Sequence, residues 1–274
     1  MKRALILVLV VVAGLLGPSP VAVAAPAPLG VTGPSNFRDV AGQGIATRTG
    51  HMATGVVYRS SKLSDLTASD IAALEAAGIS DIYDLRTPTA MRQLPDPAIA
   101  GAANHHVNLY AGHVLSSAGT TTPAKARAYM REQYRRFVSI ADQRKALGRT
   151  LRSILAADGP VIVHCTAGKD RTGWVSAMLQ EIAGVDEATI SEQYVLSNSY
   201  RAADIAQKVE AVRARYGDTR AAATSEKEVV RASYLKAGLD KAKSVYGSVR
   251  RYLIKGVGLT TTQYAALRTK LQAP

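Results

Sequence analysis

Residues 161–173 read VIVHCTAGKDRTG. The β-branched run at the start predicts a short buried strand over 160–164, and the apolar pattern after it predicts a helix over 172–183. Between them lies a tight loop that contains Gly168 and begins with Cys165, the only cysteine of the chain. A strand that passes through a short loop into a helix is typical of an α/β fold.

The loop residues favour binding of a phosphate group. Successive backbone N–H groups in such a loop form an anion-binding nest, and the N-terminus of the following helix adds a positive dipole. Arg171 follows Cys165 by six residues, so its planar guanidinium can face the same centre and hold two phosphate oxygens. The same positive field lowers the pKa of the cysteine. The pattern therefore predicts a thiolate nucleophile that attacks phosphorus.

Four alternative roles for this segment fit its residues less well. A nucleotide-binding P-loop is excluded, because Val163 stands where its first glycine is needed and Asp170 stands where Ser or Thr is needed. A buried core cysteine with an incidental arginine salt bridge is the plain structural alternative. A rhodanese-like sulfur transferase also uses a loop cysteine, but Arg171 and Thr172 suit phosphate better. A pseudophosphatase, which binds phosphate without turnover, is the alternative outside enzymes, and the intact Cys165, Asp170 and Arg171 argue against it.

Outward from the loop, strands and helices alternate before an all-helical second half. The expected strands are 56–58, 80–85 and 105–110. The expected helices are 67–78 with a capping box at its start, 124–157 with a break near 141–142, 172–183, and the chain beyond 185 with breaks at Gly217, Gly238, Gly247 and 256–258. We therefore expect an α/β fold with a central sheet flanked by helices and a helical C-terminal part. No internal repeat or composition shift marks a second domain.

The N-terminus has the layout of a secretory signal peptide: a basic start, an apolar run over 4–16 and small residues before a cleavage point after Ala24. We assign 1–24 to the signal peptide, 25–33 to a linker and 34–272 to one domain. A run this short does not suit a retained membrane span, so we expect a secreted protein without stable membrane insertion. An uncleaved N-terminal anchor is the alternative.

Composition sets further limits. The chain has 274 residues, of which 47% are hydrophobic and 20% charged, and this balance is that of a globular protein. A single cysteine excludes a disulfide framework and any multi-cysteine zinc site. The formal net charge of +13 favours contact with anions, but no nucleic-acid motif accompanies it, so no nucleic-acid partner is expected.

Residues 164–173, HCTAGKDRTG, resemble the HCx5R(S/T) signature of cysteine-dependent protein tyrosine phosphatases. Within that class the chain is most similar to a bacterial family of tyrosine phosphatases, some of which are secreted. The resemblance covers roughly 34–271, in the same order along the chain. The further motifs that carry it are Asn-Phe-Arg-Asp at 36–39, Tyr-Arg-Ser at 58–60, Asp-Leu-Arg at 84–86, Glu-Gln-Tyr-Val-Leu-Ser-Asn at 192–198, Tyr-Gly-Ser at 246–248 and Gly-Leu-Thr at 258–260.

The resemblance implies a two-step reaction without a metal or cofactor. Cys165 attacks phosphorus to form a phosphocysteine, and Arg171 stabilises the transition state together with the loop amides. Thr172 assists departure of the thiolate in the second step, and His164 fixes the loop and keeps the cysteine pKa low. The implied substrate-binding residues are Thr166, Ala167, Gly168, Lys169 and Arg59.

The leaving tyrosine oxygen needs a proton from a carboxylic acid. Many relatives of the wider class place this acid on a separate mobile loop, whereas the bacterial family has an aspartate within the loop, here Asp170. Asp84, at the end of a predicted strand, is the second candidate. The alternative for Asp84 is a salt bridge with Arg86 or Arg59.

Lys169 bears on the substrate. A lysine at this place also occurs in phosphoinositide phosphatases, so the substrate is expected to be a phosphorylated protein or a phosphoinositide. The alternative is a solvent-exposed lysine that only raises the local potential. Arg127, Arg131 and Arg135 form a basic stripe that either steers such anions or is simply solvated.

A group of histidines and an apolar stripe in the C-terminal helices are expected to have structural roles. His105, His106 and His113 are not expected to bind a metal, because adjacent residues of a strand point to opposite faces. The helical apolar stripe is most simply a core face, although relatives use helices of this region as a lid. Its members are Val230, Tyr234, Val245, Val249, Tyr252 and Leu253.

Overall fold

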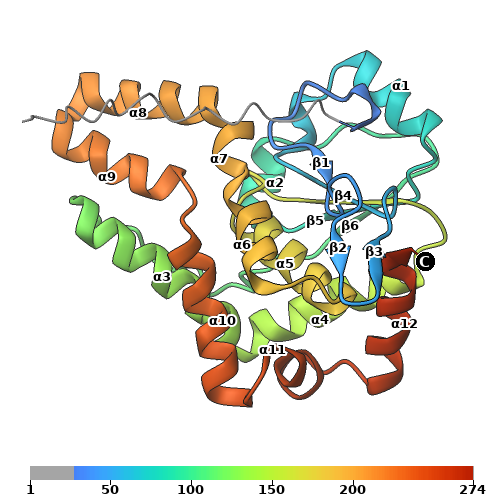
Figure 1. The fold of residues 1–274 in the computed structure, drawn as a ribbon. Helices are drawn as coiled ribbons and strands as arrows, with labels where there is room; N and C mark the ends of the chain where they lie inside the picture. Colours follow the sequence, from blue (N-terminus) through green and yellow to red (C-terminus); the bar gives the residue numbers. More distant parts are fainter. Residues whose placement is uncertain (1–27, 274) are drawn as a thin grey trace, which may run out of the picture.

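The centre of the fold is a five-stranded sheet in the order β1-β4-β7-β5-β6 (Figure 1). The computed structural model describes residues 28–273, so the predicted signal peptide lies outside the described residues. Four strands run parallel and β1 pairs antiparallel with β4. Their bounds are β1 Arg38–Asp39, β4 Val57–Ser60, β5 Asp81–Asp84, β6 Ala103–His106 and β7 Val161–His164.

Strand β7 lies in the middle of this sheet, as its uninterrupted apolar sequence requires. Its last residue, His164, is in register with Ser60 of β4 on one side and with Asp84 of β5 on the other. Because parallel strands end at the same edge, the loop after β7 starts at the centre of that edge, between the ends of its two neighbours.

The two faces of the sheet bury separate cores. Ile82 and Ile162 point to one side, where they pack with Leu74 and Ile99. Alternate residues point to the other side, into the larger core, whose members come from β4, β5, β7 and most of the helices. The sheet is therefore buried on both faces, which is the expected α/β arrangement.

The predicted helices are present in the predicted order, and the structure also has a short helix, α2, that was not predicted. The confirmed helix after Thr67 has the capping box formed with Asp70, and Gly78 follows its end with a φ of +67°. The long helical stretch is interrupted at Ile140, close to the predicted break. The bounds are α1 Ala68–Ala76, α2 Pro88–Gln93, α3 Pro123–Ser139, α4 Ala141–Ala156, α5 Arg171–Ala183, α6 Glu187–Val195, α7 Ser197–Tyr200, α8 Ala202–Tyr216, α9 Asp218–Glu228, α10 Ala232–Tyr246, α11 Val249–Arg251 and α12 Thr261–Leu271, with a π-helical turn at Tyr252–Gly256.

The prediction that Gly238 breaks a helix is wrong. Gly238 lies inside α10, and a Cβ atom there would stand 2.7 Å from the ring of Trp174. The glycine lets α10 approach α3 and α5 closely rather than ending the helix.

The strand expected at 105–110 is also misplaced, since β6 begins at Ala103 and ends at His106.

The prediction of a linker up to residue 33 is wrong at its C-terminal end. Val31 is buried in the smaller core, and the N–H groups of Thr32 and Gly33 donate to the carboxylate of Asp70. Gly33 packs so closely that a Cβ atom would meet the carbonyl oxygen of Asp65 at 2.2 Å. Residues 31–33 therefore belong to the folded domain.

The remaining elements are peripheral. A small antiparallel sheet joins β2 (Ala46–Thr47), β3 (Gly50–Met52) and β8 (Gln272–Ala273), which ties the C-terminal end of the domain to its N-terminal part.

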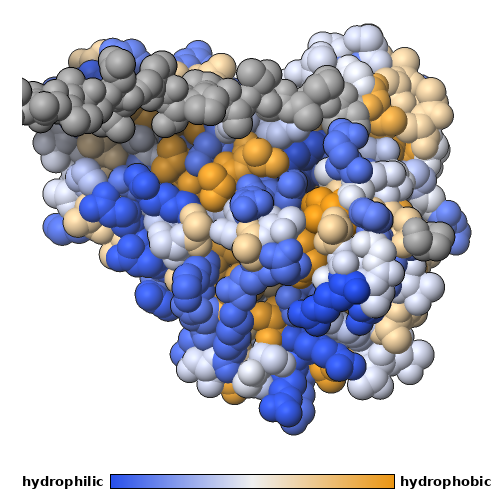
Figure 2. All heavy atoms as spheres, in the orientation of Figure 1, coloured by the Kyte–Doolittle hydropathy of each residue, from blue (hydrophilic) through white to orange (hydrophobic). Residues whose placement is uncertain are grey.

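The predicted apolar stripe of the C-terminal helices is core at most positions, but Val245 is 52% exposed. Hydrophilic side chains gather over α3, α9 and α10 in Figure 2. Among the described residues, no helix has the length and apolar character needed to cross a bilayer.

Candidate active site

The loop after β7 turns sharply at Gly168, which has a φ of +63°. A Cβ atom at this position would lie 2.5 Å from the carbonyl oxygen of Ser60 at the end of β4, so only glycine fits. The carbonyl of Thr166 accepts a hydrogen bond from the N–H of Lys62 at 3.2 Å. The loop is therefore packed directly against the end of the neighbouring strand, and α5 begins at Arg171, six residues after Cys165.

Two side chains hold the carbonyl of Gly168. The side-chain amide of Asn36 donates to it at 2.8 Å, and the guanidinium of Arg59 donates to it at 2.5 Å. Arg59 is only 3% exposed and also donates to the hydroxyl of Ser197. The structure thus places Arg59, which we predicted to bind substrate, as a buried support of the loop.

The helix after Val185 completes this support. Arg38 donates to the side-chain oxygen of Asn36, to the carbonyl of Gln193 at 3.1 Å and to the hydroxyl of Ser197 at 3.2 Å. The motifs 36–39, 58–60 and 192–198 therefore meet behind the loop. The motifs alone assign no role to Asn36 and Arg38, because the contacts of these residues span more than 100 positions.

The environment of Cys165 favours a thiolate. Burial raises the pKa of the Cys165 thiol, but the charge of Arg171 and the nearby hydroxyl and backbone N–H of Thr172 outweigh it, and the pKa lies below its usual value. The residue is buried, with an exposure of 2%. Cys165, Arg171 and Thr172 are thus brought together as predicted, in an arrangement suited to nucleophilic attack.

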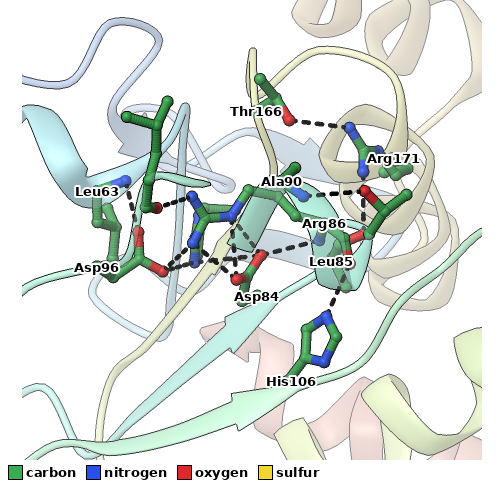
Figure 3. A network of polar contacts seen from close by, with 12 residues as sticks. Leu63, Asp84, Leu85, Arg86, Ala90, Asp96, His106, Thr166 and Arg171 are labelled. Atoms are coloured by element: carbon green, nitrogen blue, oxygen red, sulfur yellow. Dashed lines mark hydrogen bonds and ion pairs between the residues drawn. The ribbon is translucent and has the colours of Figure 1, made fainter. Parts of the chain in front are cut away.

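Arg171 is held at the edge of the sheet (Figure 3). One guanidinium nitrogen donates to the carbonyl of Leu85 at 3.2 Å and another to the hydroxyl of Thr166 at 3.3 Å. The guanidinium also lies over the ring of Tyr110, 4.6 Å from its centroid. These contacts leave a planar cation beside the loop, where it can hold two oxygens of an anion.

Asp170 has a partner at each carboxylate oxygen. The hydroxyl of Tyr134 donates to Oδ1 at 3.1 Å, and Nζ of Lys169 lies 2.7 Å from Oδ2. The alternative of a solvent-exposed Lys169 is wrong, because the residue is 4% exposed and its charge is paired with Asp170. Asp170 itself is partly exposed and lines the cleft described below.

Asp84 belongs to a buried charge network (Figure 3). Arg86 donates to its carboxylate at 2.8 and 2.9 Å and to Asp96 at 2.6 Å. Burial raises the pKa of Asp84, but hydrogen bonds from Arg86 and the charge of His164 hold it below its usual value. Asp84 is therefore an ionised structural partner, in agreement with the salt-bridge alternative.

Asp96 is a member of this network that no sequence motif indicates. It accepts from the N–H of Leu63 at 3.1 Å and lies 3.1 Å from Nε2 of His164, the residue before Cys165. Asp84, Asp96 and His164 offer atoms close enough to hold a metal ion. The guanidinium of Arg86 already supplies the positive charge between the two carboxylates, so the cluster is better suited to position His164 than to bind a metal.

The predicted histidine group is dispersed. His105 pairs with Asp81 at 2.7 Å, and His106 lies 2.9 Å from the carbonyl of Arg86. His113 pairs with Asp142 at 3.2 Å on α4. Each ring has a separate partner of its own.

A cleft of about 450 Å³ opens beside the loop. Ala167, Lys169 and Asp170 form its floor, and α3, α8 and α9 contribute its walls. Its charged residues are Lys169, Asp170, Lys208, Lys227 and Glu228, and its aromatic residues are Tyr110 and Tyr129. The predicted stripe Arg127, Arg131 and Arg135 lines none of it, and Arg127 pairs with Glu226 of α9 at 2.7 Å.

The sheet, the loop and the helix that follows define a tyrosine phosphatase-like α/β protein. The model of the tyrosine phosphatase family matches residues 29–273. The chain is 32% identical over 255 residues to the triple specificity protein phosphatase PtpB of Mycobacterium tuberculosis, covering 80% of this chain and 90% of that one. It is also 32% identical over 228 residues to a putative tyrosine-protein phosphatase of Cupriavidus necator, covering 80% of each chain.

The chain therefore belongs to the tyrosine phosphatase family and is a protein tyrosine phosphatase. Among solved structures, the Siw14 catalytic core is similar over 78% of this chain and 96% of that one, with 18% identity and a TM-score of 0.34.

Proposed function

We propose that the enzyme removes phosphate from phosphotyrosine through a covalent intermediate on Cys165. In the first step the thiolate forms a bond to phosphorus while the bond from phosphorus to the tyrosine oxygen breaks. The leaving oxygen takes a proton from Asp170. In the second step water attacks phosphorus, Asp170 accepts its proton, and the bond from sulfur to phosphorus breaks to release inorganic phosphate and the thiolate.

The observation that carries this proposal is the geometry of the loop: Cys165 is buried at its start, Gly168 turns it against the end of β4, and Arg171 reaches back across it to Thr166. The lowered pKa of Cys165 agrees with this arrangement. Arg171 and the loop amides stabilise the charge on the transferred group, and the hydroxyl of Thr172 stabilises the departing thiolate. His164 and Arg59 support the loop from behind. Asp170 rather than Asp84 is the general acid, because Asp170 borders the open cleft beside the loop, whereas Asp84 lies in the buried network around Arg86.

A second candidate substrate is a phosphoinositide. Three lysines and two carboxylates line the cleft beside the loop: Lys169 pairs with Asp170 and Lys208 pairs with Glu228. Lys227 therefore gives the cleft an excess of positive charge that a second phosphate next to the scissile one would meet. The name of the M. tuberculosis relative, a triple specificity protein phosphatase, supports a specificity wider than phosphotyrosine, including phosphoserine and phosphothreonine.

The proposal is tested with the purified protein and p-nitrophenyl phosphate in excess EDTA. We expect turnover that survives EDTA, disappears in Cys165→Ser and leaves a trapped phosphoenzyme in wild type after rapid acid quench. Asp170→Asn is compared with Asp84→Asn as the matched pair of carboxylates. Full activity in Cys165→Ser would overturn the mechanism, and a larger loss of kcat with phosphotyrosine peptides in Asp84→Asn would reassign the acid.

We also propose that the protein is exported, on the basis of the signal-peptide pattern in 1–24. N-terminal sequencing of protein recovered from the culture medium would be expected to begin at Ala25. Retention of the whole chain in the cells would contradict export.

A further inference from the structure

Two buried tyrosines connect α3 and α6 to the aspartate of the loop. Tyr134 on α3 is fully buried, and its hydroxyl donates to Oδ1 of Asp170 at 3.1 Å. Tyr194 on α6 is 2% exposed, and its hydroxyl oxygen lies 2.6 Å from that of Tyr134. Their rings pack edge to face, 5.9 Å apart between centroids.

The direction of this chain of hydrogen bonds follows from the number of hydrogens. A phenol has one hydrogen to donate, and the hydrogen of Tyr134 is committed to Asp170. Tyr194 must therefore donate to Tyr134. Burial raises the pKa of both phenols well above the usual value, so both keep their hydrogens over the whole working range of pH.

The rigidity of the pair comes from its packing. The ring of Tyr134 contacts Phe137 and Trp174 edge to face, at centroid distances of 5.6 and 6.2 Å. The ring of Tyr194 lies against Gly173 of α5, where a Cβ atom would meet it at 3.1 Å. The hydroxyl that reaches Asp170 is thus fixed by three helices rather than by the loop itself.

We propose that Tyr134, oriented by Tyr194, is a positioning residue that fixes Asp170 for proton donation to the leaving group. Because Tyr134 occupies Oδ1, the transferable proton is carried by Oδ2, so the ion pair between Oδ2 and Lys169 in the substrate-free protein must open when Asp170 takes up that proton. As the bond from phosphorus to the leaving oxygen breaks, Oδ2 releases its proton to that oxygen and the carboxylate returns to the ion pair with Lys169. This inference rests on the proposed role of Asp170 as the general acid.

The test uses leaving groups of different basicity. A general acid matters most for a strongly basic leaving group, so phenyl phosphate and phosphotyrosine depend on it, whereas p-nitrophenyl phosphate depends on it little. Because Asp170 also acts in the second step, which is the same for every substrate, the comparison uses kcat/KM, which reports the first step alone. We expect Tyr134→Phe to lower kcat/KM about tenfold with phenyl phosphate and less than about twofold with p-nitrophenyl phosphate. Tyr194→Phe leaves the Tyr134–Asp170 hydrogen bond in place, so it should cause a smaller loss with the same selectivity.

Tyr252→Phe is the matched structural control. Tyr252 is also a fully buried tyrosine, and its hydroxyl donates to the α3 backbone at Phe137 but does not contact the loop. This variant should lower thermal stability without changing the ratio of the two kcat/KM values. Near-ultraviolet circular dichroism of each variant establishes that it is folded before its kinetics are compared.

A double-mutant cycle decides whether Tyr134 acts through Asp170. In an Asp170→Asn background, Tyr134→Phe should change kcat/KM with phenyl phosphate by less than about twofold, because the acid is already absent. A tenfold loss of kcat/KM in that background, or an equal loss of kcat/KM with both substrates in the single variant, would overturn the proposal. Failure of the proposed function is a different outcome, in which Cys165→Ser keeps the activity of the wild type.

Discussion

Oδ2 of Asp96 lies 3.1 Å from Nε2 of His164, and the two residues are 68 positions apart in the chain. Asp96 also accepts from Arg86, so a carboxylate far from the loop in sequence joins the strand end to the segment after α2. His164 is fully buried and precedes Cys165 directly. The contact therefore links the position of Cys165 to a buried charge network at the end of the sheet.

Asp96→Asn is expected to destabilise the fold. It removes the charge that faces Arg86 and His164, and breaking a buried charge network from one side costs about 3 kcal/mol in free energy of unfolding. Urea denaturation followed by circular dichroism measures this change. The matched control is Asp142→Asn, whose carboxylate pairs with His113 and Lys145 at an exposed site and should leave the midpoint unchanged. Equal midpoints for the two variants would contradict a structural role for Asp96.

Gly168→Ala is expected to abolish turnover and lower stability. The new Cβ atom would meet backbone atoms of Ser60 at 2.5 Å, and the residue would keep a φ of +63°. Gly217 serves as the control that separates the steric contact from the backbone strain. Its φ is +78°, but nothing lies within 4 Å of the position of an added Cβ atom. Gly217→Ala should cost about 1 kcal/mol from the backbone conformation alone, and Gly168→Ala clearly more. Similar losses in both, measured by urea denaturation, would mean that contact with Ser60 is unimportant.

Alkylation of Cys165 is expected to persist below the pH at which a free thiol reacts. Only the thiolate reacts with iodoacetamide, and the pKa of Cys165 is lowered because Arg171 and Thr172 outweigh burial. The rate of inactivation should therefore fall only when the pH drops through this lowered pKa. Arg171→Met removes the positive charge while burial remains, so the midpoint should move upward, past that of a free thiol.

Thr172→Val serves as the graded control for this titration. It removes the hydroxyl that helps to lower the pKa of Cys165 but keeps the backbone N–H of residue 172 and the charge of Arg171, so its midpoint should move upward by less than that of Arg171→Met. An unchanged midpoint in Arg171→Met would show that Arg171 does not set the state of Cys165.

Local signals in the sequence are sufficient for the elements around the loop. The Thr67–Asp70 capping box, Gly78 and the run that forms β7 depend on neighbours within a few residues, and the structure confirms all three. Gly238 shows the limit of such signals. A glycine in a helical pattern predicts a break, but here it is required by Trp174, which is 64 positions away.

The residues of the candidate site also fall into two groups: those that local sequence signals indicate and those that only long-range contacts reveal. Cys165 and Arg171 lie in one segment and can be found from their spacing, whereas Asp170 and Thr172 in the same segment are indicated by the resemblance to the phosphatase signature. Tyr134 and Asp96 cannot be found in either way, because each reaches the loop from a distant element and neither belongs to a recognisable motif. Arg59 can be found through its motif, but no pattern tells whether a buried arginine faces the substrate or, as here, the back of a loop.

Lys227→Ala is expected to weaken binding of substrates with more than one phosphate. Lys227 lines the cleft beside Lys169, whereas the control residue Lys236 pairs with Asp240 away from it. With a bisphosphorylated inositol substrate, we expect KM to rise about fivefold in Lys227→Ala and to stay unchanged in Lys236→Ala, while kcat with p-nitrophenyl phosphate is the same in both. The difference should diminish as salt is added, because the cleft is open to solvent and the interaction is screened. A rise in KM of equal size for p-nitrophenyl phosphate would mean that Lys227 acts on the scissile phosphate or on the fold, and that the cleft does not select a second anionic group.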